Sequence, residues 1–191
     1  MTIIVLFGAP GVGKGTQGAL IAEKYGYLHM STGSILREEV ARHTPLGAEI
    51  ESYISQGHLV PDKMICNIVV EEINKHKEQK GIILDGFPRT LSQAEFLDIM
   101  LFEKGLKVDI MIDIQANRDI LVDRLVKRGT LSHRADDTQE TIQKRLQIYD
   151  YQTAPLIGYY QQTENYNVIN SEDSIENTFE EIVALIDSKT T

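Results

Sequence analysis

A glycine-rich segment directly follows an apolar run near the N-terminus, and this combination constrains the fold more than any other feature of the chain. The apolar run is Ile3-Ile4-Val5-Leu6-Phe7, and the segment is Gly8-Ala9-Pro10-Gly11-Val12-Gly13-Lys14-Gly15-Thr16. A buried strand that ends in such a loop and opens into a helix directs backbone N–H groups and the positive end of the helix toward an anion. Lys14 adds a mobile full charge. The pattern predicts a phosphate-binding loop.

One position in this loop narrows the class of protein. Gly15 stands where most loops of this kind carry the Ser or Thr that binds magnesium directly, and Thr16 comes one place later. This departure argues against a GTPase-like switch and favours a kinase of small molecules.

Length and composition indicate the kind of protein that carries this loop. The 191 residues fit one domain with room for a small insertion, and the net charge of -9 speaks against nonspecific binding to nucleic acid or anionic membranes. A single cysteine, Cys66, rules out an internal disulfide and a multi-cysteine zinc site. Strand-forming residues begin at Thr2 and no apolar run is long enough to span a bilayer, so we expect a soluble, cytoplasmic protein without a signal peptide.

Strand-like and helical segments alternate along the whole chain. The expected strands are Ile3 to Phe7, Tyr27 to Met30, Ile82 to Leu84, Ile110 to Ile114, and Tyr166 to Ile169. Helical periodicity covers Gly15 to Lys24, Ser34 to Arg42, Gly47 to Gln56, Lys63 to Glu78, Leu91 to Glu103, Arg118 to Lys127, Thr138 to Tyr151, and Ile175 to Ser188. This order predicts one α/β domain over 1–191, a five-stranded parallel sheet with helices on both faces. Ligands should bind beyond the carboxyl ends of the strands.

Asp85 ends the third expected strand. A carboxylate at such a place in a phosphoryl-transfer enzyme holds magnesium or its coordinated water. A strand-end Asp is more often a turn former or a helix cap. Because the first strand carries a phosphate loop, we favour a role for Asp85 in binding magnesium through water.

Five arginines lie between Arg118 and Arg145. Arg124 and Arg128 are four residues apart on one expected helix, so they project from the same face, and neither has an acidic partner at a matching offset. A solvated face with ion pairs is therefore the weaker reading. Convergent guanidinium groups are what a polyphosphate needs. Arg118 points off this face and is expected at the surface.

Several motifs, taken together, resemble adenylate kinase, of the nucleoside monophosphate kinase family. They follow the order and spacing of that family from end to end: Gly8 to Gln17, Ser31-Thr32-Gly33, Leu36-Arg37, Asp85-Gly86-Phe87-Pro88-Arg89-Thr90, Gln93, Arg134-Ala135-Asp136-Asp137 and Ala154-Pro155-Leu156. The resemblance implies a P-loop NTPase-type fold with a helical segment over 31–60 that binds the monophosphate and a short lid loop over 128–138.

The reaction implied by the resemblance is MgATP + AMP ⇌ MgADP + ADP, in adenine nucleotide homeostasis and purine salvage. The residues implied for ATP are Gly11, Val12, Gly13, Lys14, Gly15, Thr16, Arg124, Arg128 and Asp173. Those implied for AMP are Thr32, Arg37, His58, Leu59, Val60, Gly86, Phe87, Pro88, Arg89, Gln93, Arg134 and Arg145. The catalytic set would be Lys14, Arg89, Arg124, Arg128, Arg134 and Arg145. The implied cofactor is Mg²⁺ bound with ATP, without zinc, in a monomer.

Two alternatives to this reading stay open. Kinases of UMP and CMP look similar but usually have Ala at the place of Thr32 and Asn-rich residues after the Pro-Arg, so Thr32, Thr90 and Gln93 favour AMP. The Gln93 amide offers a donor and an acceptor together, which can pair with the adenine edge. A regulatory nucleotide-binding module would be expected to have lost Lys14 or several arginines.

Four finer expectations follow. The family often has a cis peptide at the place of Phe87-Pro88. Ser34 replaces the usual Asp near the magnesium hydration shell and is expected to cap a helix. Only Gly129 to His133 separates Arg128 from Arg134, too few residues for a lid domain, and Asp137 with Glu140 is expected to cap the next helix. The five histidines, His29, His43, His58, His76 and His133, show no metal-site spacing and are expected at the surface or in packing.

Overall fold

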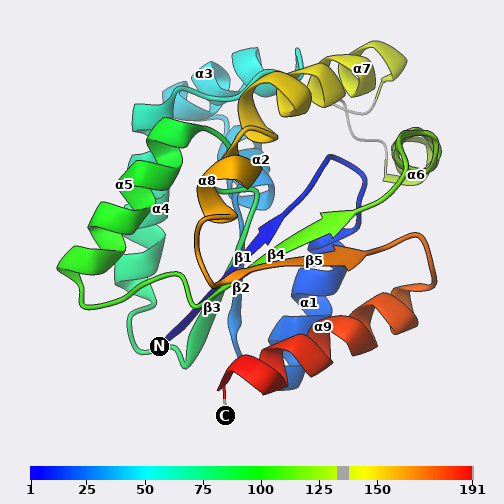
Figure 1. The fold of residues 1–191 in the computed structure, drawn as a ribbon. Coiled ribbons are helices and arrows are strands. Elements are labelled where there is room, and N and C mark those ends of the chain that lie inside the picture. Colours follow the sequence, from blue (N-terminus) through cyan, green and yellow to red (C-terminus); the bar gives the residue numbers. More distant parts are fainter. Residues whose placement is uncertain (133–137, 191) are drawn as a thin grey trace.

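The five apolar runs form one parallel sheet in a computed structural model that describes residues 1–132 and 138–190. The strand order is β2-β3-β1-β4-β5 (Figure 1). The strands are β1 (Thr2–Phe7), β2 (Leu28–Ser31), β3 (Gly81–Asp85), β4 (Ile110–Gln115) and β5 (Tyr166–Asn170). The three central strands are apolar almost throughout because helices cover both of their faces. The α/β fold expected from the sequence is confirmed.

Ten helical elements cover or border this sheet in the described part of the chain. They are α1 (Lys14–Tyr25), α2 (Thr32–Ala41), α3 (Pro45–Ile54), α4 (Asp62–Lys75), α5 (Leu91–Glu103), α6 (Arg118–Ser132), α7 (Gln139–Ile148), the π-helix η1 (Tyr149–Thr153), α8 (Leu156–Tyr160) and α9 (Ile175–Thr190). In none of them does a segment combine the length and the apolar content needed to cross a membrane, as far as the described residues go.

Alternate side chains of β1, the central strand, point into two separate cores on opposite faces of the sheet, as the pleat of a strand requires. Ile3 and Val5 pack with residues of α4, α5 and α8 on one face of the sheet. Ile4 and Leu6 pack on the other face with residues of α1, α6 and α9. Figure 1 shows α4 and α5 side by side on one side of the sheet, with α1 and α9 on the other.

The strand register brings the expected functional segments to one edge. Leu6 pairs with Asp85, and Ser31 pairs with the same residue from the other side. The loop after β1, the start of α2 after β2, and the Asp85-Gly86 turn after β3 therefore begin at the same level. This is the edge at which parallel sheets bind ligands.

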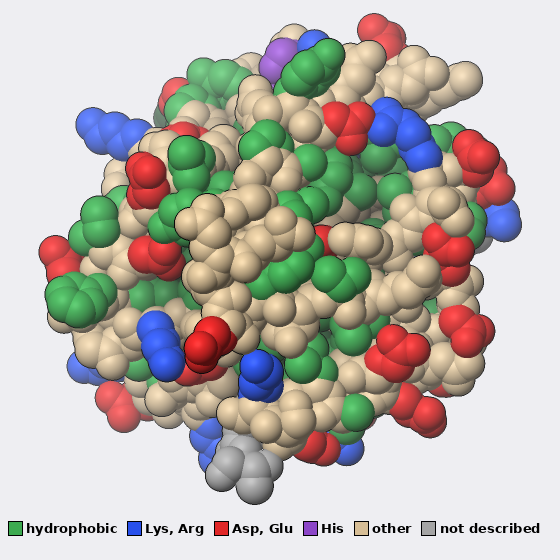
Figure 2. Space-filling view, viewed as in Figure 1, with side chains coloured by type: hydrophobic (Ala, Val, Ile, Leu, Met, Phe, Trp, Pro, Cys, Tyr) green, Lys and Arg blue, Asp and Glu red, His purple; other side chains and the backbone are tan. Residues whose placement is uncertain are grey.

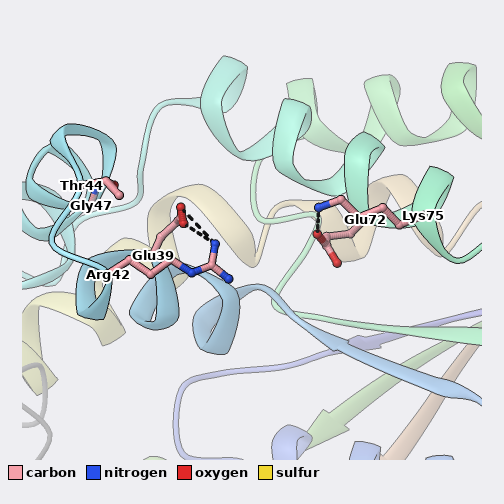
Figure 3. Close-up of polar contacts among 6 residues, drawn as sticks. All are labelled: Glu39, Arg42, Thr44, Gly47, Glu72 and Lys75. Carbon is pink, nitrogen blue, oxygen red and sulfur yellow. Dashed lines mark hydrogen bonds and ion pairs between the residues drawn. The ribbon is translucent and has the colours of Figure 1, made fainter.

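The helices α2 and α3 pack against each other and form most of the 31–60 segment. Thr44 caps α3 by accepting a hydrogen bond from the Gly47 backbone N–H at 2.9 Å, and Pro45 occupies the first helical position. Figure 3 shows this cap together with two ion pairs at i,i+3 spacing, Arg42 with Glu39 on α2 and Lys75 with Glu72 on α4. Acidic and basic side chains are scattered over the face drawn in Figure 2 without forming a basic patch.

Three local expectations are wrong. Ser34 does not cap α2, because that helix begins at Thr32 and its cap position is Ser31; the Ser34 hydroxyl accepts a hydrogen bond from Arg37 Nη2 at 3.2 Å. The cap of α7 is Thr138, whose hydroxyl accepts from the Thr141 backbone N–H at 3.3 Å; Asp137 lies outside the described residues. The helix expected to run to Tyr151 ends at Ile148, and η1 and α8 follow it.

The region between Arg128 and Arg134 was expected to be a loop, but part of it is helical. Helix α6 continues through Ser132, and the Thr130 hydroxyl donates to the Lys127 carbonyl at 2.8 Å within it. Residues 128–132 are thus helical, whereas 133–137 lie outside the described residues. The Phe87-Pro88 peptide is cis, as expected.

The two-sided core makes a direct stability prediction. Ile83 is fully buried on β3, whereas Ile99 on α5 is 61% exposed. We expect Ile83→Ala to lower the free energy of unfolding by about 2–5 kcal/mol, and the same change at Ile99 to alter it by about 0.5 kcal/mol or less. Urea unfolding followed by circular dichroism measures both. Equal effects of the two variants would contradict the placement of β3 in the core.

Candidate active site

The loop between β1 and α1 has the backbone form of a phosphate cradle. Gly8 and Gly13 have φ values of 131° and 103°, in the region that favours glycine. A Cβ at Gly8 would collide with the carbonyl oxygen of Ile114 on β4, so the loop passes directly against the neighbouring strand. No described side chain caps α1, whose first N–H groups open on the cleft that the loop lines.

Lys14 folds back over this loop. Its Nζ donates to the carbonyl oxygens of Gly8 at 2.7 Å and Ala9 at 3.0 Å. Burial lowers the pKa of Lys14 to about 8; the carboxylate of Asp85 opposes this shift, and the charges of Arg89, Arg145 and Arg128 add to it. The Lys14 ammonium thus has one carboxylate and three guanidinium groups acting on it, so the phosphates of a nucleotide would add negative charge where cations are in excess.

Asp85 faces this lysine from the end of β3. Its side chain is nearly buried, and its Oδ2 lies 3.2 Å from His29 Nε2. Burial alone would raise the pKa of Asp85, but the hydrogen bond with His29 and the charge of Lys14 outweigh burial and lower it. The carboxylate is therefore ionised at neutral pH, as a magnesium ligand must be.

The surroundings of Asp85 fit a magnesium ion bound mainly by nucleotide phosphates. A Cβ built at Gly15 would lie 3.7 Å from Asp85 Oδ2, so this glycine leaves the space in front of the carboxylate open. Magnesium typically takes one or two carboxylates together with phosphate oxygens and water. Among the described residues no group of three or more His, Cys, Asp or Glu side chains could hold a metal ion by itself.

His29 is the residue that the sequence reading missed. It was expected only at the surface or in packing, yet it lines the cleft and contacts Asp85. The contact exists because β2 lies beside β3, and the periodicity of the sequence does not reveal which strands are neighbours. No local signal around His29 distinguishes it from the other histidines.

A cleft of about 810 Å³ gathers most of the expected ATP residues beyond the carboxyl ends of the strands. Arg124 lines it and is held by Ser171, to whose carbonyl its Nη2 donates at 2.7 Å. The expected residues along its walls are Gly11, Val12, Gly13, Lys14, Gly15, Thr16, Arg37, Leu59, Asp85, Gly86, Pro88, Arg89, Arg124, Arg128, Arg145 and Asp173. Arg118 instead pairs with Asp150 at 2.7 Å on the exposed surface.

A second, smaller recess of about 80 Å³ adjoins the cleft, between the 31–60 segment and the residues that follow β3. Gly86 stands between Thr32 and Arg89: its φ is 82°, and a Cβ there would lie 2.8 Å from Thr32 Oγ1 and 2.7 Å from Arg89 Nη2. The residues expected at the AMP site that line this recess are Thr32, Arg37, His58, Leu59, Val60, Gly86, Arg89, Gln93 and Arg145.

Three residues of the expected AMP set are not placed in this recess: Phe87, Pro88 and Arg134, of which Pro88 lines the larger cleft instead. The Phe87 side chain is buried in the core with α4 and α5, so only its backbone is available to a ligand. Arg134 lies outside the described residues.

Cys66 is a buried thiol, as expected, and burial raises its pKa to about 11, which keeps it unreactive.

The fold and the site together define a P-loop phosphotransferase of the kinase type. The cleft offers a phosphate-binding loop with its lysine, a buried carboxylate and arginines on several elements, beside a recess with polar side chains of its own. No side chain among these residues forms a nucleophile–base pair, and transfer of a phosphoryl group between bound substrates needs none.

Comparisons with known proteins identify the family. The model of the family described as adenylate kinase matches residues 6–165. Curated adenylate kinases are similar over nearly the whole chain: that of Phocaeicola vulgatus is 48% identical over 187 residues, covering 98% of this chain and 99% of the relative. That of Bacteroides fragilis is 47% identical over 188 residues, covering 98% and 100%. This chain belongs to the adenylate kinase family, whose reaction is ATP + AMP ⇌ 2 ADP.

The lowered pKa of Lys14 makes a prediction about proton uptake. With a pKa of about 8, roughly half of the free enzyme carries an uncharged Lys14 at pH 8. ATP should restore the charged form, while its own terminal phosphate, with a second pKa near 6, is already ionised. Calorimetric titration with ATP at pH 8 in two buffers of different ionisation enthalpy should reveal uptake of about 0.5 proton.

The matched control is Lys14→Met, which removes the amine and keeps the length of the side chain. It should abolish the dependence of the binding enthalpy on the buffer. The assignment fails if the wild-type enthalpy is the same in both buffers, or if the buffer dependence persists in the variant.

Proposed function

We propose that this chain transfers the terminal phosphoryl group of MgATP to AMP, with ATP along the 810 Å³ cleft and AMP in the adjoining recess. The observation that carries this assignment is that Lys14 and Asp85 line the same cleft as Arg37, Arg89 and Arg145, which also line the recess and so mark the boundary between the two spaces. A donor and an acceptor bound on either side of this boundary would meet in line there.

Each charged group of the cleft would then have its own role in the transfer. Backbone N–H groups of residues 11–16 hold the ATP phosphates, and Lys14 leaves the loop carbonyls to follow the charge on the transferred group. Asp85 would hold Mg²⁺ through water, and the chemistry that the metal supplies when bound would be neutralisation of charge on the phosphate oxygens. Arg89, Arg124 and Arg145 would surround the transferring group together with the lid arginines Arg128 and Arg134. Asp173 would lie by the ATP adenine.

The recess would bind AMP through groups of different kinds. Arg37 and Arg89 take its phosphate, because paired guanidinium groups match phosphate oxygens. Thr32 and Gln93, both nearly buried, read the base. The backbone of 58–60 and of 86–89 completes the pocket around the nucleoside.

Closure of two segments would exclude water before transfer. We infer that the 31–60 segment closes over AMP and that residues 128–138 close over ATP as a short lid, since an open site would let water accept the phosphoryl group. We further propose that the protein acts as a cytoplasmic monomer, as the family resemblance implies.

Lys14→Ala tests the proposed role of the lysine. Because one preorganised cation at the reacting phosphate is removed, we expect kcat for transfer from MgATP to AMP to fall at least about 100-fold. Far-ultraviolet circular dichroism and the midpoint of thermal unfolding should stay near those of the wild type. Turnover close to the wild-type value in a folded variant would refute the mechanism.

Gln93→Ala tests the assignment of the recess. Loss of the base-reading amide should raise the Michaelis constant for AMP about tenfold or more and leave that for MgATP nearly unchanged, because Gln93 lines the recess and not the larger cleft. Steady-state kinetics with each substrate varied in turn makes the comparison. Equal increases of both constants would remove Gln93 from the AMP site.

A further inference from the structure

We infer that Asp62 is a specificity-determining positioning residue, which holds the Gln93 amide in the one orientation that accepts a six-amino purine and rejects a six-oxo purine. This inference rests on the proposed AMP site and names how that site chooses its base. Asp62 is the first residue of α4 and lies just after the 31–60 segment. It is not among the site residues expected from the sequence.

The Asp62 carboxylate binds two side chains that come from the start of α5. Its Oδ1 accepts a hydrogen bond from Gln93 Nε2 at 2.6 Å, and its Oδ2 accepts one from the Thr90 hydroxyl at 2.9 Å. Thr90 also caps α5 by accepting from the Gln93 backbone N–H at 3.2 Å. The carboxylate therefore ties the start of α4 to the first turn of α5.

The other end of the Gln93 amide is fixed as well. Its Oε1 accepts a hydrogen bond from the Arg89 backbone N–H at 2.7 Å. An ionised carboxylate only accepts hydrogen bonds and a backbone N–H only donates them. Reversal of the amide would therefore place oxygen against the oxygen of Asp62 and N–H against the N–H of Arg89. Gln93 is 2% exposed, so water could not relieve these two mismatches.

This fixed orientation leaves one N–H hydrogen on Nε2 and one lone pair on Oε1 for a ligand in the recess, which Gln93 lines. In adenine, a six-amine that donates stands beside a ring nitrogen that accepts, so Oε1 pairs with the amine and Nε2 with the ring nitrogen. In a six-oxo purine the group at position six accepts, and the amide would have to present nitrogen there. Asp62 and the Arg89 backbone both oppose that exchange.

A purely structural role of Asp62 makes a different prediction. An acid in the first turn of a helix stabilises it through the helix dipole, and its loss would weaken the fold or the binding of any acceptor alike. The orientation role instead changes the ratio between two acceptors that differ at position six. Comparison of AMP with inosine monophosphate separates the two roles.

Asp62→Asn is the informative variant, since it keeps the size of the side chain but can turn either its oxygen or its NH₂ toward Gln93. We expect the preference for AMP over inosine monophosphate, measured as the ratio of kcat/KM values, to fall about tenfold. The Michaelis constant for MgATP should stay unchanged. Asp119→Asn is the matched control, because it removes an exposed first-turn acid from α6; it should keep the wild-type ratio.

Three results would overturn the inference. The first is an unchanged ratio, with kcat/KM for both acceptors lowered equally in folded Asp62→Asn. The second is an Asp119→Asn variant with the same loss of discrimination. The third needs no variant and so holds even if Asp62→Asn does not fold: wild-type protein that uses or binds inosine monophosphate as well as AMP. Wild-type protein that transfers to neither acceptor would instead refute the proposed function itself.

Discussion

The register of β1 between β3 and β4 is the constraint on which the rest of the site depends. Since Leu6 pairs with Asp85, the loop that carries Lys14 begins level with the carboxylate that opposes it. This pairing is held by an apolar interior on both faces of β1, so the segments that carry Lys14 and Asp85 begin directly at the core. A shift of one residue would turn the core side chains to the wrong faces and separate Lys14 from Asp85.

Electrostatics explains how a protein of net charge -9 can bind polyanions. Lys14, Arg89, Arg128 and Arg145 gather in one cleft, where burial lowers the pKa of the lysine and the charges of the three arginines add to this shift. Asp85 is the counter-charge within the cleft, and its hydrogen bond with His29 and the charge of Lys14 together outweigh burial and lower its pKa. The local gathering of these cations, and not the net charge of the chain, is what would attract the phosphates of two nucleotides.

The sequence alone predicted the strands and the phosphate loop, which depend on local pattern. It did not predict side-chain contacts that depend on which strands and helices lie side by side in the fold. Apolar runs and glycine spacing located every strand to within about two residues and gave the phosphate loop, because burial and backbone form leave a direct trace in the chain. The contacts of His29 with Asp85 and of Asp62 with Gln93 join residues 56 and 31 positions apart. Such pairs follow from strand order and helix packing, which periodicity does not specify. Thr138 replaced Asp137 as a cap because both are good caps and tertiary packing decides between them.

Steady-state transfer from MgATP to AMP, CMP, UMP and GMP in parallel, with a control that lacks an acceptor, tests the central claim most directly. The proposed mechanism predicts strong preference for AMP and negligible loss of ATP in the control, because the proposed site would read adenine and close against water. Preference for CMP or UMP would contradict the reading of Thr32 and Gln93. Tight binding of ATP without transfer to any acceptor would contradict the phosphotransferase assignment as a whole.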